Sequence, residues 1–70
     1  MNLINLNEKA ITNIKIGDEV RSYLTHDIGT ISEVDLENKT ISISWANGHE
    51  SSEVAHNRLK TVGYVNKVSN

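Results

Sequence analysis

The chain has 70 residues, with 7 basic and 9 acidic side chains, a formal net charge of −2 and no cysteine. This length supports one domain, and the missing cysteine excludes disulfide bridges and thiolate zinc sites. Uninterrupted apolar runs are at most two residues long, so the sequence contains neither a transmembrane span nor the apolar core of a signal peptide. We therefore expect a soluble, cytoplasmic protein with no membrane partner.

The first 14 residues form a lead-in that is unusually apolar for a terminal segment. Its leucines and isoleucines are Leu3, Ile4, Leu6, Ile11 and Ile14. A domain this small buries a limited share of its surface, and oligomerisation is a common way to stabilise it when disulfides and metals are absent. We expect residues 1–14 to be partly ordered, to pack on the main domain, or to bind a partner such as a second copy.

Two strands are predicted after the lead-in. Glu19–Leu24 has the alternation of a strand, and Ile28–Leu36 has the length of a long, bent one. Within the second strand, Ile31 and Val34 lie three residues apart, so strict alternation cannot place both on one face. A β-bulge near Ser32–Glu33 resolves this conflict and also bends the strand.

The strongest local pattern is a hairpin in the middle of the chain. Ile41, Ile43 and Trp45 alternate with small or polar residues, which predicts a strand with one buried face and Trp45 in the core. Asn47-Gly48 follows, and both residues tolerate positive φ, as a two-residue type I′ turn requires. The strand His49–Val54 then returns alongside.

The last part of the chain predicts a short helical turn at Val54–Leu59 and a closing strand at Leu59–Val62, which Gly63 breaks. Tyr64, Val65 and Val68 could extend the pairing, and residues 66–70 form a tail. Five short strands with no proline and no long helix are typical of a small all-β barrel or sandwich. We assign this domain to residues 15–65.

The order of these signals resembles a Src-homology-3-like barrel, the architecture of KOW and Tudor modules. The resemblance lies in Gly17-Asp18-Glu19-Val20-Arg21, in Gly29-Thr30-Ile31 with Val34-Asp35, in Ile41–Trp45 with Asn47-Gly48, and in Leu59 with Val62. It implies a five-stranded barrel with a short helical turn before the last strand. Because unrelated activities share this barrel, the resemblance implies no single function.

Five residues form a predicted binding surface: Arg21, Tyr23, Arg58, Lys60 and Tyr64. Arg21 and Tyr23 lie two apart on one strand face, where a base could stack beside a cation. Against nucleic-acid binding stands an acidic row, Glu33, Asp35 and Glu37, which is typical of a solvated face that discourages edge pairing. An aromatic cage for a methylated cation needs several exposed rings, and Tyr23 and Tyr64 alone do not provide it.

Catalytic and metal sites are not predicted. The histidines, His26, His49 and His56, form no helical i, i+4 pair, and Ser51-Ser52 alternate faces in a strand, so they form no preformed triad with His49. Type II dihydrofolate reductases use the same barrel and open with a stretch similar to Gly17–Arg21. Their active-site stretch corresponds here to Ser51–Val54 and does not match it at any position.

We therefore expect a non-catalytic binding or accessory module without a cofactor, engaged in protein–protein interaction or self-association. The first alternative is a KOW-like module that contacts RNA or DNA. The second is a small oligomeric enzyme whose site forms between subunits.

Overall fold

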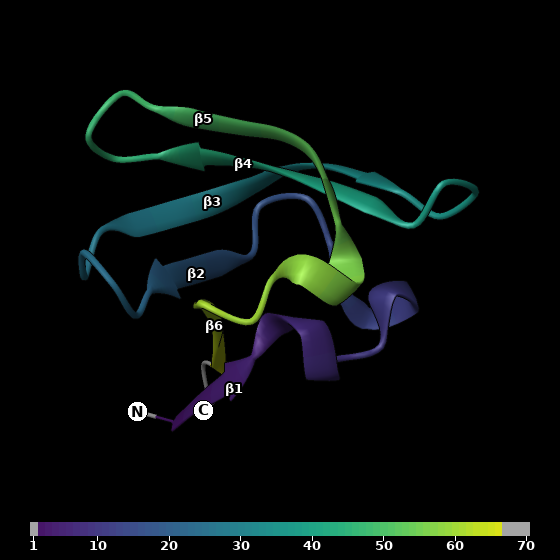
Figure 1. Ribbon diagram of the computed structural model, residues 1–70, viewed down its shortest axis with the longest axis horizontal. Coiled ribbons are helices and arrows are strands. Elements are labelled where there is room, and N and C mark those ends of the chain that lie inside the picture. Colours follow the sequence, from purple (N-terminus) through teal and green to yellow (C-terminus); the bar gives the residue numbers. More distant parts are fainter. Residues whose placement is uncertain (1, 67–70) are drawn as a thin grey trace.

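The computed structural model describes residues 2–66 and consists of one antiparallel sheet with three short 3-10 turns (Figure 1). Within this range the sheet has six strands in the order β1-β6-β2-β3-β4-β5. The strands are β1 (Asn2–Asn5), β2 (Glu19–Ser22), β3 (Ile28–Asp35), β4 (Thr40–Trp45), β5 (Glu50–Ala55) and β6 (Val62–Asn66). The 3-10 turns are η1 (Leu6–Glu8), η2 (Ile11–Asn13) and η3 (His56–Arg58). The expected all-β class is confirmed.

The sheet differs from the predicted one in strand number and in closure. It has six described strands rather than five, and the outermost strands, β1 and β5, are not paired with each other. The additional strand is β1, which pairs with β6 through Leu3↔Val65 and Ile4↔Tyr64. The sequence did not predict it because Leu3 and Ile4 are adjacent, so their side chains point to opposite faces and leave no alternating pattern.

Two β-bulges bend the sheet at the level of Ser42. The bulge predicted near Ser32–Glu33 is confirmed, because the β3–β4 register shifts between Ile31 and Glu33. A second shift lies in β5, where Ser52 and Glu53 oppose Ser42 alone. Glu53 has a φ of 49°, and its N–H donates a hydrogen bond to Ser42 Oγ at 3.0 Å. A bulge on each side of β4 increases the local twist and curves the sheet around its inner face.

The hydrophobic core covers the inner face of this curved sheet. Strand β4 contributes Ile41 and Ile43, and Trp45 packs half-buried against the same cluster. The other buried members are Leu6, Ile14, Val20, Ile31, Leu59 and Val62. Trp45 was expected in the core, but it is only partly buried and packs against the buried cluster, and its indole Nε1–H donates a hydrogen bond to Ser51 Oγ at 2.9 Å.

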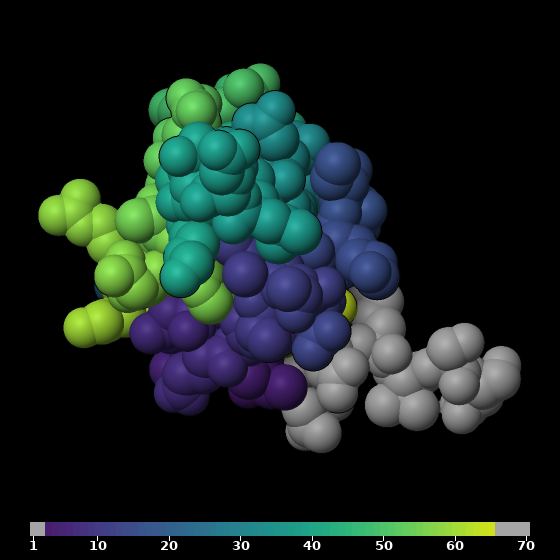
Figure 2. Space-filling view, turned by 90° about the vertical axis from the view of Figure 1, so that its right-hand side faces the viewer, coloured from purple at the N-terminus to yellow at the C-terminus, as the bar shows by residue number. Residues whose placement is uncertain are grey.

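The lead-in packs on its own sheet. Leu6 is fully buried, and the Nε2–H of His56 is shared between the carbonyl oxygens of Leu6 and Lys9, at 2.9 and 2.7 Å. Since both partners are acceptors, this ring nitrogen carries the hydrogen. Figure 2 shows the N-terminal segment, in purple, directly beneath the β3–β4 hairpin, in teal. Leu3 and Ile4 remain 37% and 39% exposed.

The closing segment begins later than predicted. Val54 and Ala55 belong to β5, the helical turn is limited to His56–Arg58, and the last strand is Val62–Asn66 rather than Leu59–Val62. Leu59 N–H still bonds to the carbonyl of His56, which keeps Leu59 at the end of the turn. Gly63 lies inside the strand instead of breaking it. Val68 and most of the predicted tail lie outside the described residues.

The Asn47-Gly48 turn is a hairpin loop of another type than predicted. Gly48 has a φ of +94°, but Asn47 does not have positive φ, so the turn is not type I′. Gly48 N–H bonds to the carbonyl of Trp45, and Trp45 N–H bonds to the carbonyl of His49. This is a three-residue loop in which a type I turn precedes a left-handed glycine, and it also matches the twist of the strands.

Replacing Gly29 by alanine is expected to destabilise the protein. A Cβ atom at this position would lie 2.7 Å from Ile43 Cγ2 and 2.7 Å from Trp45 Cε3. Overpacking of this kind costs about 1–3 kcal/mol, which urea unfolding measures. The exposed Ser44→Ala on β4 is the control and should stay within about 0.5 kcal/mol. Equal stability of both variants would show that the Trp45 ring does not lie on Gly29.

Replacing Gly48 by valine is expected to lower stability by more than about 1 kcal/mol, because a β-branched residue is strained at positive φ. A Cβ atom at Gly48 meets nothing within 4 Å, so the cost comes from the backbone alone. Gly48→Asn tests this, because asparagine adopts left-handed conformations more readily. Thermal melts should rank the proteins wild type, then Gly48→Asn, then Gly48→Val; a valine variant that melts like wild type contradicts the loop assignment.

Candidate functional site

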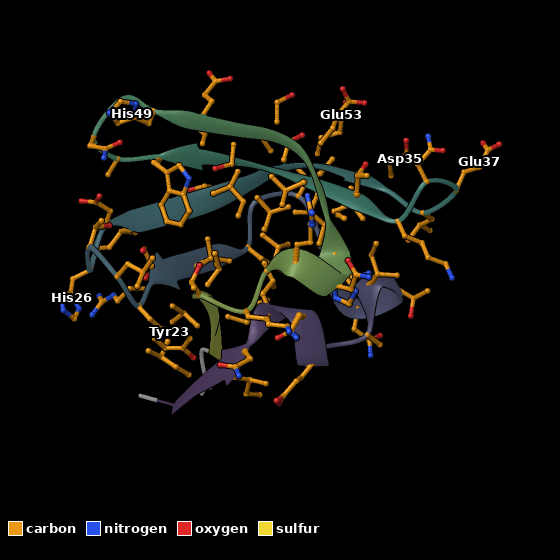
Figure 3. The ribbon with its side chains drawn as sticks, in the orientation of Figure 1. Tyr23, His26, Asp35, Glu37, His49 and Glu53 are labelled. Carbon is orange, nitrogen blue, oxygen red and sulfur yellow. The ribbon has the colours of Figure 1, made fainter. Side chains whose placement is uncertain are left out.

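Charge is unevenly distributed along the fold. The segment from β3 to β5 has five acidic residues and a single basic residue, Lys39. The acidic residues are Glu33, Asp35, Glu37, Glu50 and Glu53. Figure 3 shows Asp35, Glu37 and Glu53 along the upper edge of the molecule, on β5 and on the hairpin between β3 and β4. One half of the sheet is therefore acidic, although the net charge of the chain is only −2.

Asp35 is held in its charged form by its own turn. Its carboxylate accepts hydrogen bonds from the N–H groups of Asn38 and Glu37 at 3.1 Å, and from Asn38 Nδ2 at 2.9 Å. The bonds from Asn38, backbone first, lower the pKa of Asp35 below its ordinary value of 3.8. The turn between β3 and β4 thus holds a negative charge in a fixed position at one end of the acidic half.

A hollow of about 230 Å³ lies in this acidic half, and we call it the serine hollow. Its lining residues are Ser32, Glu33, Ser42, Glu50, Ser51 and Ser52. The two bulges produce it, since Ser32 is the extra residue of β3 and Ser52 belongs to the bulge of β5, with Ser42 between them. Bulges are frequent beside functional sites because they change the direction of a side chain.

The strand alternation accounts for the carboxylates that line the hollow. Glu33 pairs with Ser42, and Glu50 pairs with Ser44, so both glutamates project on the face opposite Ile41 and Ile43. Glu53, beside the hollow, adopts a φ of 49° that costs a non-glycine residue free energy. Such a strained residue is a recognised indicator of functional sites.

The chemistry of the lining suits a cation. The carboxylates of Glu33 and Glu50 accept hydrogen bonds, and no lining residue carries a positive charge. Two lining hydroxyls already accept a hydrogen bond within the protein, Ser42 from Glu53 N–H and Ser51 from Trp45 Nε1–H. An ammonium or guanidinium group would find charge-assisted acceptors here. Among the described residues no group of three or more histidine, aspartate or glutamate side chains is placed to hold a metal ion.

The predicted binding surface is divided by the sheet. Arg21 pairs with Gly63, and a Cβ atom at Gly63 would lie 2.8 Å from Tyr23 Oη, so the Tyr23 ring lies over Gly63 beside Arg21. Tyr64 follows Gly63 in β6, and its side chain therefore projects from the opposite face. The structure brings Arg21 and Tyr23 together and separates Tyr64 from them.

The remaining residues of the predicted surface have separate positions. Arg58 lies in η3, Lys60 follows it before β6, and both are exposed. Tyr64 packs partly buried against the core and makes two polar contacts there. Its hydroxyl donates a hydrogen bond to Asp18 Oδ2 at 3.1 Å, and Lys9 Nζ lies 4.3 Å from its ring centroid, within cation–π range.

The serine hollow could be predicted from the sequence only in part. The bulge at Ser32 is indicated by the sequence, because Ile31 and Val34 lie three residues apart and must reach the same face. The bulge at Ser52–Glu53 has none, since Glu53 is not a residue that favours positive φ. Without that second bulge, strict alternation places Ser51 and Ser52 on opposite faces of the strand. It does not predict that they lie beside Ser42.

No protein-family model, curated protein or solved structure matches this chain. No helix within residues 2–66 is long and apolar enough to cross a membrane.

The ionisation of Tyr64 should report its contact with Asp18. Burial, followed by the hydrogen bond to Asp18 and its charge, raises the pKa of Tyr64 above the ordinary 10.0. Because the folded chain holds this proton more tightly than the unfolded chain, the contribution to stability is complete below pH 10.0 and is lost as the pH rises through the folded pKa.

Absorbance of tyrosinate in a Tyr23→Phe background measures Tyr64 alone, since the chain has two tyrosines. Adding Asp18→Asn should lower the measured pKa, and Asp27→Asn, outside the contact, should leave it unchanged. A pKa that does not respond to Asp18→Asn contradicts this geometry.

Proposed function

We propose that this protein is a non-catalytic binding module that engages a basic segment of a partner protein through the serine hollow. The observation that supports this function is the hollow itself, lined by two carboxylates and four serines in the acidic half of the sheet. Protein–protein interaction remains the proposed function. The candidate surface is now the outer face of β3, β4 and β5 instead of Arg21 and Tyr23.

We further propose a Src-homology-3-like barrel as the architecture. Three features support it: strands β2 to β5 are neighbours in chain order, the 3-10 turn η3 precedes the last strand, and β6 returns to pair with β2. Because the last strand, β6, returns to pair with β2, the sheet curls around the core. The lead-in strand β1 extends this arrangement at its edge.

The expected strength of the interaction is modest for each contact. Exposed ion pairs contribute about 0.2–1 kcal/mol, so a single lysine in the hollow would bind weakly. A segment with two or more cations can pair with both Glu33 and Glu50, the carboxylates that line the hollow. Binding should weaken as salt rises, because these charges are exposed.

A nucleic-acid function is supported less well. The acidic half would repel phosphates, which leaves Arg21, Arg58 and Lys60 as the candidate contacts. An enzyme with a site between subunits requires self-association. For that, Leu3 and Ile4 on the edge strand β1 are the exposed apolar residues of the lead-in, whereas Leu6 and Ile14 are already used in the core. Sedimentation equilibrium tests self-association directly.

The binding experiment uses a lysine- and arginine-rich peptide, with an acidic peptide of equal length as its counterpart, measured by fluorescence anisotropy. The basic peptide should bind the wild type, and Glu33→Gln with Glu50→Gln together should weaken it about fivefold, as two exposed ion pairs imply. Glu8→Gln with Glu37→Gln is the matched control, because this pair removes the same number of exposed charges and neither residue lines the hollow.

Two outcomes contradict the proposal. If the basic peptide binds no better than the acidic one, a basic segment is excluded as the partner. If the control pair Glu8→Gln with Glu37→Gln weakens binding as much as Glu33→Gln with Glu50→Gln, the hollow is not the site and the attraction is diffuse. A duplex oligonucleotide that binds the wild type with a steep salt dependence would favour the nucleic-acid alternative instead.

A further inference from the structure

Two loops meet at one end of the sheet, and the side chain of Asn47 joins them. Figure 3 shows His26 of the β2–β3 loop and His49 of the β4–β5 hairpin at this end. Asn47 Nδ2 donates a hydrogen bond to Asp27 Oδ2 at 3.0 Å, across 20 positions of sequence. Its Oδ1 accepts a hydrogen bond from the backbone N–H of His49 at 2.9 Å. The carboxamide is therefore held at both ends.

The sequence at this junction is chemically reactive. The backbone nitrogen of Gly48 can attack Asn47 Cγ, which forms a C–N bond and a five-membered succinimide, while the C–Nδ2 bond breaks and ammonia leaves with the proton of Gly48 N–H. Water then opens either carbonyl of the ring, restoring the N–H and giving aspartate or isoaspartate. Glycine hinders this attack least because it has no side chain, and Asn47 is the single asparagine followed by glycine.

The geometry points to Asn47 as a deamidation site that the folded structure protects and whose modification separates the two loops. Protection follows from the hydrogen bonds, because the nucleophile, Gly48 N–H, bonds to the carbonyl of Trp45 at 3.0 Å and the carboxamide is held by Asp27 and His49. Both residues are exposed, so water reaches them, and the reaction waits on local opening of the loop.

The product changes the charge at the junction. A carboxylate at position 47 replaces the donor Nδ2 with an oxygen and faces the carboxylate of Asp27, so a hydrogen bond becomes a repulsion between like charges. Isoaspartate also adds a backbone atom to a loop whose length is set by the pairing of Trp45 with His49. Either product loosens the end of the sheet that contains Trp45.

The experiment follows deamidation of the full chain in mildly alkaline buffer, folded and in urea, by peptide mapping with mass spectrometry. The product at Asn47 should form about tenfold or more faster in the unfolded chain, and Asp27→Ala should raise the folded rate severalfold. Asp35→Ala is the matched control, since Asp35 holds Asn38 by the same kind of bond at 2.9 Å. It should leave the rate at Asn47 unchanged.

The variant Asn47→Asp supplies one product directly. It should melt below wild type and shift the emission of Trp45, the single tryptophan. If no product forms at Asn47 in the unfolded chain, Asn47 is not a deamidation site. If folded wild type and Asp27→Ala deamidate at equal rates, the hydrogen bond to Asp27 does not protect Asn47. An Asn47→Asp variant that melts and emits like wild type overturns the separation of the loops.

Discussion

The structure depends on burying the inner face of β4. Ile41, Ile43 and Trp45 project from one side of this strand, and a single sheet must supply the cover for them. A flat sheet would leave that face in water, so both neighbours of β4 bend around it, each through a bulge at the level of Ser42. At the other end, the missing side chain of Gly29 leaves room for the Trp45 ring.

The same bend produces the candidate site on the opposite face. Where β3 and β5 curve toward the core, their extra residues turn outward around Ser42 and form the serine hollow. The cost of the bend is visible in Glu53, whose positive φ is partly compensated by its hydrogen bond to Ser42 Oγ. Core burial and site geometry are thus two consequences of one pair of bulges.

The lead-in completes the cover that the curved sheet cannot provide alone. Leu6 enters the core, and the His56 imidazole fixes the backbone around it to the turn before β6. This explains why an apolar segment of the chain need not be a mobile tail. Leu3 and Ile4, on opposite faces of β1, stay exposed, and Ile11 packs partly buried against the core.

The sequence alone determined the all-β class, the inward face of Ile41 and Ile43, and the bulge at Ser32, because these depend on the spacing of apolar residues within one strand. The tertiary structure decided the strand β1, the bulge at Glu53 and the contact of Tyr23 with Gly63, because each depends on a segment distant in the sequence. The candidate site falls in this second group. Its serines and glutamates come from three strands, and only the curvature of the sheet brings them to one hollow.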